Sequence, residues 1–175
     1  MTFIVVPDIV GHKPLQRSLP KLERAVEMIN NKRVTVDNLQ EDFARYMASV
    51  LKARVKRSIY SQKLGSKSMK QVYKPLSTDY QTRKLKVNKD KFWINTGFLV
   101  ENLQMWKSGD TYRVGFKNSI KYPGTNTKLA QVIVWLEKGT KKIPARPLFT
   151  VHSKYMMKHI DVFFNHYLKI RFNIN

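Results

Sequence analysis

The stretch "VWLEKGTKKIPARPLF", residues 134–149, connects an apolar run to the last apolar segment of the chain. The apolar run ends at Glu137, and a glycine and a basic loop follow. Gly139 can leave a strand with dihedral angles that other residues resist, and Pro144 confines the residue before it to extended conformations. Pro147 suits the first turn of a helix. The pattern predicts a rigid corner between a strand and a helix.

The segments on both sides of this corner have contrasting patterns. Upstream, strand signals predict "FLVENLQMW", "TYRVGF" and "AQVIVWLE" within residues 98–137. The turn "KSGD" between the first two places Gly109 where a hairpin needs it. Beyond Pro147, the segment "LFTVHSKYMMKHIDVFFNHYLKI" predicts one helix that runs nearly to the end.

The clearest helix signal covers residues 37–64. Asp37 and Gln40 have the spacing of a capping box, and "LG" at 64–65 supplies a stop. Apolar residues then recur at spacings of three and four: Leu39, Phe43, Met47, Val50, Leu51, Val55 and Ile59. Arg45, Lys52, Lys56, Arg57 and Lys63 occupy much of the rest. They form either a solvated face or a docking face for an acidic partner or a phosphate backbone.

Together these signals predict an α+β fold: N-terminal helices, a central antiparallel β meander of about three to four strands and a C-terminal packing helix. We expect a single domain over residues 1–175. Its predicted parts are an extended arm at 1–20, a helical part at 21–84, the meander at 85–137, and the basic loop and last helix at 138–175. The arm leads into a short helix "KLERAVEMINN", and Ser77 is a candidate N-cap.

Charge is the strongest bulk signal. The chain carries 33 Lys and Arg against 12 Asp and Glu, a formal net charge of +21. Such a surplus favours contact with a polyanion or an acidic protein surface. The basic segment "GSKSMKQVYK", residues 65–74, reads as a mobile loop. Candidate contacts for DNA or an acidic partner are Lys63, Lys67, Lys70 and Lys74. No apolar run is long enough to predict a membrane span, no signal peptide is recognisable, and no cysteine is present.

The sequence offers little for catalysis. His152, His159 and His166 fall seven residues apart, which puts successive histidines about 10 Å apart on a helix, too far to share a metal ion. Glu137 has no second carboxylate at short spacing on its strand, so two-metal nuclease chemistry has no scaffold. Neither glycine-rich phosphate-binding motif occurs. We therefore expect no enzyme, no metal and no cofactor.

The corner resembles the C-terminal signature of the small tail-completion, or neck, proteins of tailed bacteriophages. In that family a strand ends in Glu-x-Gly-Thr, a basic loop follows, and (I/M)-P-A-R-P-(F/L) opens the last helix. The matching residues are Glu137, Gly139, Thr140, Ile143, Pro144, Ala145, Arg146, Pro147 and Leu148. Lys138 departs from the pattern, because position x is usually apolar or aromatic in the family.

Two upstream segments are similar to the related Mu-type virion morphogenesis proteins. "KPLSTDYQTRK" looks like their W-x-P-L-S…K segment, with Tyr73-Lys74 in place of the tryptophan step. "WINTGFL" looks like their (L/I)-x-x-T-G-x-L segment, carried by Ile94, Thr96, Gly97 and Leu99. The three segments occur in the family order, and the resemblance covers roughly residues 37–170. The N-terminal arm has no counterpart in the family.

The resemblance implies a structural virion protein assembled in the host cytoplasm. It would form a ring, a hexamer or a multiple of one, that joins the head connector to the tail. Its expected partners are itself, neighbouring neck, connector and tail proteins, and DNA in the channel, with no membrane. The alternative is a basic, non-enzymatic DNA- or RNA-binding protein.

For the corner itself two interpretations stand: a strand-to-helix joint alone, or a joint that also carries the subunit contact. The planar fork of Arg146 favours a carboxylate. That carboxylate is either Glu137 of the same subunit or an acidic residue of a neighbour. The residues predicted to contact a subunit or partner are Glu137, Gly139, Thr140, Lys141, Lys142, Pro144, Arg146 and Pro147.

Overall fold

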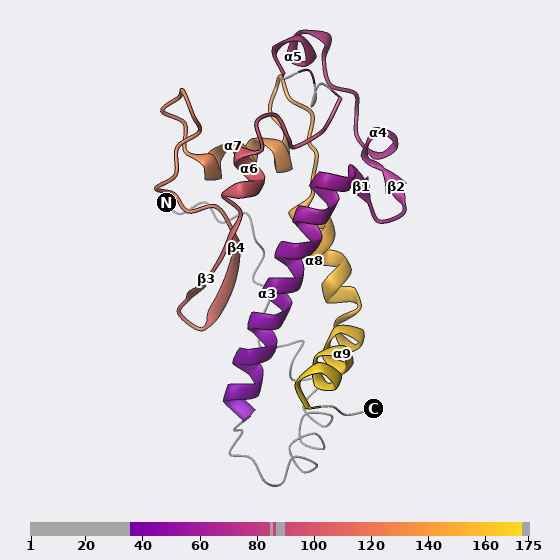
Figure 1. The fold of residues 1–175 in the computed structure, drawn as a ribbon, viewed down its shortest axis with the longest axis vertical. Coiled ribbons are helices and arrows are strands. Elements are labelled where there is room, and N and C mark those ends of the chain that lie inside the picture. The colour runs from indigo at the N-terminus through magenta and orange to yellow at the C-terminus, as the bar shows by residue number, and fades with distance from the viewer. Residues whose placement is uncertain (1–35, 85, 87–89, 173–175) are drawn as a thin grey trace.

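The computed structural model describes residues 36–84, 86 and 90–172. The arm and the short helix expected before residue 32 lie outside the described residues, as does the side chain of Asp37, the expected N-cap. The described part contains helices and two small antiparallel sheets (Figure 1). The α+β class expected from the sequence is confirmed.

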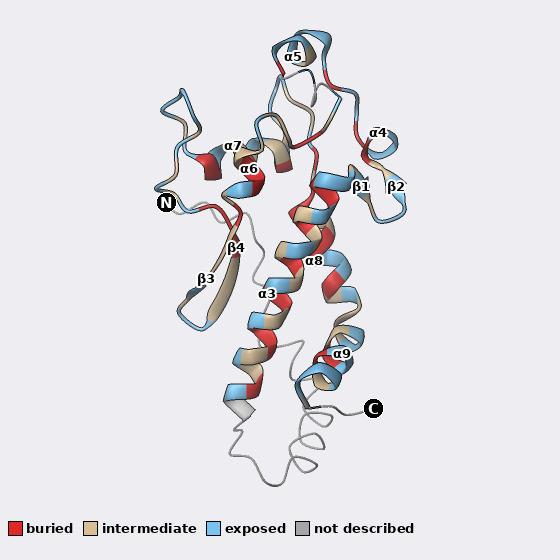
Figure 2. Cartoon of the chain, in the orientation of Figure 1, coloured by how far each residue is buried: buried red, intermediate tan, exposed pale blue. Residues whose placement is uncertain are grey.

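The long helix α3, Val36–Ser61, forms the spine of the molecule (Figure 1). Its buried side chains lie on one stripe, seen as the red band along α3 in Figure 2. Six of the seven predicted apolar positions are buried: Leu39, Phe43, Met47, Leu51, Val55 and Ile59. Val50 is half-buried. The three-and-four spacing thus identified the face of this helix that enters the core.

Two consecutive helices pack along α3. They are α8, Phe149–Lys158, and α9, Ile160–Phe172. The sequence predicted one continuous helix here, which is a correction. His159 caps α8 with φ −114° and ψ 30°, and its backbone N–H donates to both Tyr155 and Met156 carbonyls at 3.2 Å. The bend keeps Met156 on α8 and Phe164 and Tyr167 on α9 against the core.

The hairpin predicted around Gly109 is confirmed, although its first strand is shorter than expected. Strand β3, Gln104–Ser108, pairs with β4, Thr111–Gly115, and Gly109 turns between them with φ 60°. β4 lies against α3. Residues 98–101 were expected to extend the first strand, but Phe98–Glu101 forms helix α6, which starts at Gly97 with φ 91°.

The prediction of a third strand in the meander is wrong. Leu129–Lys138 forms helix α7, so the sheet around β3 has only two strands. The β-branched residues Val132, Ile133 and Val134 favour a strand by propensity. The residues Leu129, Ile133 and Glu137 are nevertheless buried, and their spacing of four means that one face of a helix enters the core. A short apolar run does not distinguish these two outcomes by periodicity.

The basic segment 65–74 is folded rather than an open loop. Strands β1, Lys63–Leu64, and β2, Lys67–Ser68, form a second hairpin that turns at Gly65 and leads into α4, Met69–Val72. Ser68 and Gln71 form a capping box on α4. Met69 is fully buried and Tyr73 nearly so, and these two side chains anchor the segment.

Helix α5, Thr78–Arg83, follows, with Ser77 as N-cap as predicted.

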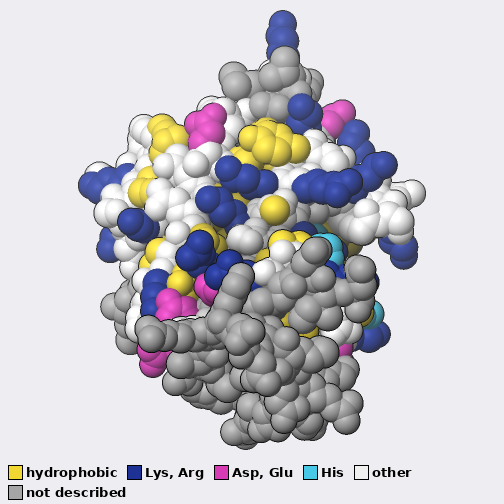
Figure 3. All heavy atoms as spheres, turned by 60° about the horizontal axis from the view of Figure 1, so that its bottom comes forward, with side chains coloured by type: hydrophobic (Ala, Val, Ile, Leu, Met, Phe, Trp, Pro, Cys, Tyr) yellow, Lys and Arg dark blue, Asp and Glu magenta, His cyan; other side chains and the backbone are white. Residues whose placement is uncertain are grey.

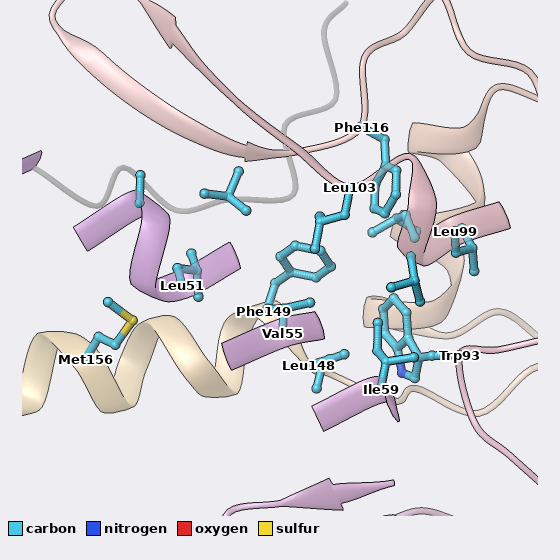
Figure 4. Packing of buried hydrophobic residues seen from close by; sticks show 14 of the residues in the cluster. Leu51, Val55, Ile59, Trp93, Leu99, Leu103, Phe116, Leu148, Phe149 and Met156 are labelled. Carbon is cyan, nitrogen blue, oxygen red and sulfur yellow. The ribbon is translucent and has the colours of Figure 1, made fainter. Parts of the chain in front are cut away.

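The hydrophobic core is centred on Phe149, at the start of α8. In Figure 4 this ring lies between Leu51, Val55 and Ile59 of α3 and a group from the middle of the chain. That group includes Trp93 and Phe116, whose ring centroids lie 6.1 and 6.3 Å from that of Phe149. Leu148 and Phe149, the first two residues after Pro147, therefore lie at the centre of the hydrophobic core.

Candidate functional site

Glu137, the last buried residue of α7, caps the N-terminus of α8. Its Oε1 accepts the backbone N–H of Leu148 at 2.6 Å and that of Phe149 at 2.8 Å. Its Oε2 accepts the backbone N–H of Thr150 at 3.3 Å and the Thr150 hydroxyl at 2.9 Å. These N–H groups have no partner within the helix, and the carboxylate also lies at the positive end of the helix dipole. Glu137 thus fixes the angle between the two helices.

The loop between α7 and α8 is closed by its own backbone. Gly139 caps α7 with φ 78°, and a Cβ at this position would lie 2.7 Å from the backbone nitrogen of Ala145. Thr140 N–H donates to the Ile143 carbonyl at 2.7 Å, and the Thr140 hydroxyl accepts from Ile143 N–H at 3.0 Å. The N–H of Arg146 returns to the Leu136 carbonyl at 2.7 Å. The predicted rigid corner therefore exists, but it joins two helices.

Arg146 does not pair with Glu137, which corrects the intramolecular ion pair considered above. The Glu137 oxygens are occupied by α8, and no carboxylate among the described residues lies within ion-pair distance of Arg146. The guanidinium instead lies over the ring of Phe92, with 5.4 Å between its central carbon and the ring centroid. Arg146 is only 5% exposed, and its buried Nε has no hydrogen-bond partner.

Tyr73 links the corner to α4. Its hydroxyl donates to the Pro147 carbonyl at 2.6 Å, and its ring meets that of Phe92 edge-on at 5.7 Å. Burial, with a smaller effect of the Glu137 charge, raises the pKa of the Tyr73 hydroxyl. The phenol therefore stays protonated and keeps donating this bond. The backbone of Phe92 is held in turn by the Gln62 side chain, which accepts its N–H at 2.6 Å and donates to its carbonyl at 3.0 Å.

The predicted interface residues divide into two groups. Glu137 and Arg146 are buried, and Gly139, Pro144 and Pro147 are half-buried. Thr140, Lys141 and Lys142 are exposed and form the outer tip of the corner. In Figure 1 this loop rises between α7 and α8 toward α5. Among the predicted interface residues, 140–142 are therefore the most accessible to a neighbouring molecule, and the buried Glu137 and Arg146 lie beneath them.

The four candidate polyanion-contact lysines all lie on the β1–β2 hairpin, on α4 or just after it, and all are exposed: Lys63, Lys67, Lys70 and Lys74. Lys70 forms an ion pair with Asp90 at 3.3 Å. No acidic partner within ion-pair distance is described for the other three. Figure 3 shows one face of the molecule, on which Lys and Arg side chains far outnumber acidic ones.

The three histidines have unlike environments. His152 is buried on α8, and its Nε2 lies 2.9 Å from the Ser58 hydroxyl of α3. Burial, with a smaller effect of Arg54, lowers the pKa of His152 to about 4, so this ring is neutral at pH 7. His159 is half-buried at the bend between the helices, and His166 is exposed on α9. The described residues contain no group of three or more His, Cys, Asp or Glu side chains that could hold a metal ion.

Several residues that build this region were missed by sequence reasoning. They are Tyr73, Lys84 and Phe92, together with Gln62, whose backbone has φ 53°. Each lies far from the corner in the sequence, and none shows a local pattern that points to it. Trp93 and Phe116 are buried in the core, whereas Trp135 is 36% exposed.

Comparison with models of protein families, with curated proteins and with solved structures gives no significant match. Among the described residues, no helix is both long enough and apolar enough to cross a membrane.

Proposed function

We propose that this chain is a structural protein of the bacteriophage neck, which forms a ring between the head connector and the tail. The observation that carries the proposal is the corner at 137–149. The residues that match the family signature hold the corner in one conformation: Glu137 caps α8, and Gly139 admits the backbone of Ala145. A ring of identical subunits needs such fixed elements, because each head-to-tail contact must repeat at one angle for the ring to close.

In this proposal the tip at Thr140–Lys142 contacts the next subunit. The tip is exposed, while the loop behind it is closed by backbone hydrogen bonds at both ends. A preorganised loop loses little conformational freedom on binding, so more of its interaction energy appears as affinity. The two lysines of the tip would face carboxylates of the neighbour.

The charge of +21 must also be balanced in an assembled ring. Four of the described acidic residues, Glu41, Asp42, Asp79 and Asp90, are already in ion pairs, and Glu137 caps α8. Glu101, Asp110 and Asp161 are the exposed acidic residues that remain among those described: they could meet the tip lysines of a neighbouring copy but are too few to balance the whole surplus. Acidic faces of adjoining neck proteins, or DNA in the channel, would supply the balance. DNA that slides through a ring can be contacted only through its phosphates, independently of sequence.

Assembly of the full chain tests the proposal. We expect wild-type protein to form closed rings by mass photometry and negative-stain electron microscopy as its concentration rises, or to enter particles when head and tail components are present. The double variant Lys141→Glu/Lys142→Glu should stay monomeric and keep the wild-type unfolding midpoint. Lys154→Glu/Lys158→Glu, which makes the same charge change at exposed positions of α8, is the matched control. Assembly that survives the tip variant contradicts the role of the corner.

The charge favours a second candidate, a free protein that binds DNA or RNA. A salt titration separates the two. Tight binding to a DNA duplex by the monomer, with log Kd strongly dependent on log salt, supports this second function. Weak binding by the monomer together with ring formation supports the neck protein.

A further inference from the structure

Two basic side chains, Lys84 and Arg146, are buried next to the corner, and neither has an acidic partner among the residues that the structure describes. Lys84 is 7% exposed and Arg146 is 5% exposed. Lys84 follows α5 and donates to the carbonyl of Lys91, while Arg146, 62 positions later in the loop before α8, lies over the ring of Phe92. The fold thus brings both cations to the adjacent residues 91 and 92. Burial lowers the pKa of Lys84, and the charge of Arg146 lowers it further by disfavouring the charged form of Lys84.

The hydrogen-bond donors of this pair are mostly unused. The Lys84 ammonium donates to the Lys91 carbonyl and lies 5.5 Å from the centroid of the Tyr80 ring. The Arg146 guanidinium stacks on Phe92, and its Nε is buried with no acceptor. An ammonium has three donors and a guanidinium five, so most of these N–H groups have no acceptor among the described residues.

The neighbouring carboxylates are committed elsewhere. Asp90, whose charge favours the protonated form of Lys84, forms its ion pair with Lys70 at 3.3 Å. Both carboxylate oxygens of Glu137 accept hydrogen bonds from the N-terminus of α8. Among the described residues, no acidic group lies within ion-pair distance of Lys84 or Arg146.

Two unpaired buried cations are costly, because each loses its hydration and repels the other. The cost is visible at Lys84, where burial and then the charge of Arg146 lower its pKa to about 8. Arg146 cannot lose its proton at physiological pH, so for that residue loss of charge offers no relief. An anion between the two groups would remove both the repulsion and the unsatisfied donors.

We propose that Lys84 and Arg146 bind a small tetrahedral oxyanion, inorganic phosphate or sulfate, as a structural counter-ion of the fold. The guanidinium fork matches two oxygens of such an ion, and the ammonium supplies a point charge to a third. Because both side chains are more than nine-tenths covered within one chain, a free ion suits the site better than a carboxylate from another copy. This inference does not depend on the proposed role in the phage neck.

Thermal unfolding of the full chain tests the site. After dialysis into chloride buffer, we expect phosphate at constant ionic strength to raise the Tm by several degrees and to saturate, as binding to one native site requires. Phosphate also stabilises proteins weakly through exclusion from their surface, but that effect grows without saturation. Lys84→Met and Arg146→Met should each lose the saturable part. Lys86→Met, at an exposed position two residues away, should keep it.

The design remains decisive if Arg146→Met does not fold. Lys84→Met retains most of the length of the side chain without its charge, and Lys84→Arg should keep the phosphate response. An equal, unsaturating response of wild type and Lys84→Met overturns the proposal. So does a Tm that is indifferent to phosphate but rises with protein concentration, because the missing anion would then come from a second copy. The phosphate response of Lys84→Met is read at one protein concentration and does not depend on ring formation, so the two proposals fail separately.

Discussion

The Oε1 atom of Glu137 accepts the backbone N–H of Phe149 at 2.8 Å, so a side chain at the end of one helix caps the start of the next. Phe149 is also the ring around which the core closes, in contact with Trp93 and Phe116. One hydrogen-bonded pair therefore sets both the angle of the corner and the position of a central core residue. Changes at the corner should be measurable first as changes in stability.

Glu137→Gln should lower the free energy of unfolding by about 1–3 kcal/mol, because the buried N–H groups of α8 lose a charged acceptor and face an amide. Urea denaturation followed by circular dichroism measures the change. Glu101→Gln, at an exposed position, is the control and should change stability by less than about 0.5 kcal/mol. Equal effects of the two substitutions would contradict the capping role.

Gly139→Ala should destabilise the protein far more than the same change at other glycines with positive φ. The added Cβ would lie 2.7 Å from the Ala145 nitrogen and 2.9 Å from the Ile143 carbonyl oxygen. Gly109→Ala shares the positive φ but has open space around its Cβ position. We expect about 1 kcal/mol for Gly109→Ala and at least about 2 kcal/mol more for Gly139→Ala. Chemical denaturation of both variants gives the difference, and similar losses would show that the close approach is not required.

Tyr73→Phe removes the hydroxyl that donates to the Pro147 carbonyl at 2.6 Å. The carbonyl then loses a partner, and we expect a loss of about 1–2 kcal/mol. Tyr112→Phe removes a hydroxyl that reaches exposed Glu41 at 3.1 Å and should cost less than about 0.5 kcal/mol. Equilibrium unfolding of the pair tests whether the link between α4 and the corner contributes to stability.

His152 should make the protein sensitive to mild acid. Its pKa is about 4 in the folded protein and 6.5 for the ordinary side chain, so the unfolded chain binds the proton more readily. The stability contributed by the neutral ring is complete above pH 6.5 and is lost as pH falls from 6.5 toward 4. The loss is on the order of 3 kcal/mol.

His152→Gln keeps a side chain able to reach Ser58 and should flatten this part of the stability curve. His166→Gln, at an exposed position on α9, should leave the curve unchanged. Urea unfolding at several pH values between 4 and 7 measures both slopes. An unchanged slope in His152→Gln would mean that other groups cause the acid sensitivity.

Much of the architecture could be predicted from the sequence where a pattern was long. The apolar spacing from Leu39 to Ile59 identified α3 and its buried face, and Gly109 identified the hairpin. The prediction failed at residues 129–138, because ten residues with a β-branched centre fit either a strand or a helix with one buried face. Packing of Leu129 and Ile133 against the rest of the core decided for the helix.

At the corner, too, local sequence patterns predicted one part of the structure and packing decided the other. The glycine and prolines of 139–147 sufficed to predict a rigid turn, since their backbone restrictions are local properties of each residue. Which groups pair is not a local property. The carboxylate of Glu137 was considered for Arg146, yet the fold places it at three free N–H groups of α8 and leaves Arg146 beside Phe92 and near Lys84.

By itself, then, the sequence determined the α+β class, the long helix, the hairpin and the presence of a corner, because these follow from spacing and backbone preference over short distances. Only the tertiary structure decided the capping of α8, the link from Tyr73 to Pro147 and the burial of Lys84 and Arg146 at residues 91 and 92. These depend on contacts between residues up to 74 positions apart, where the competition between burial, charge and hydrogen bonding is settled by packing.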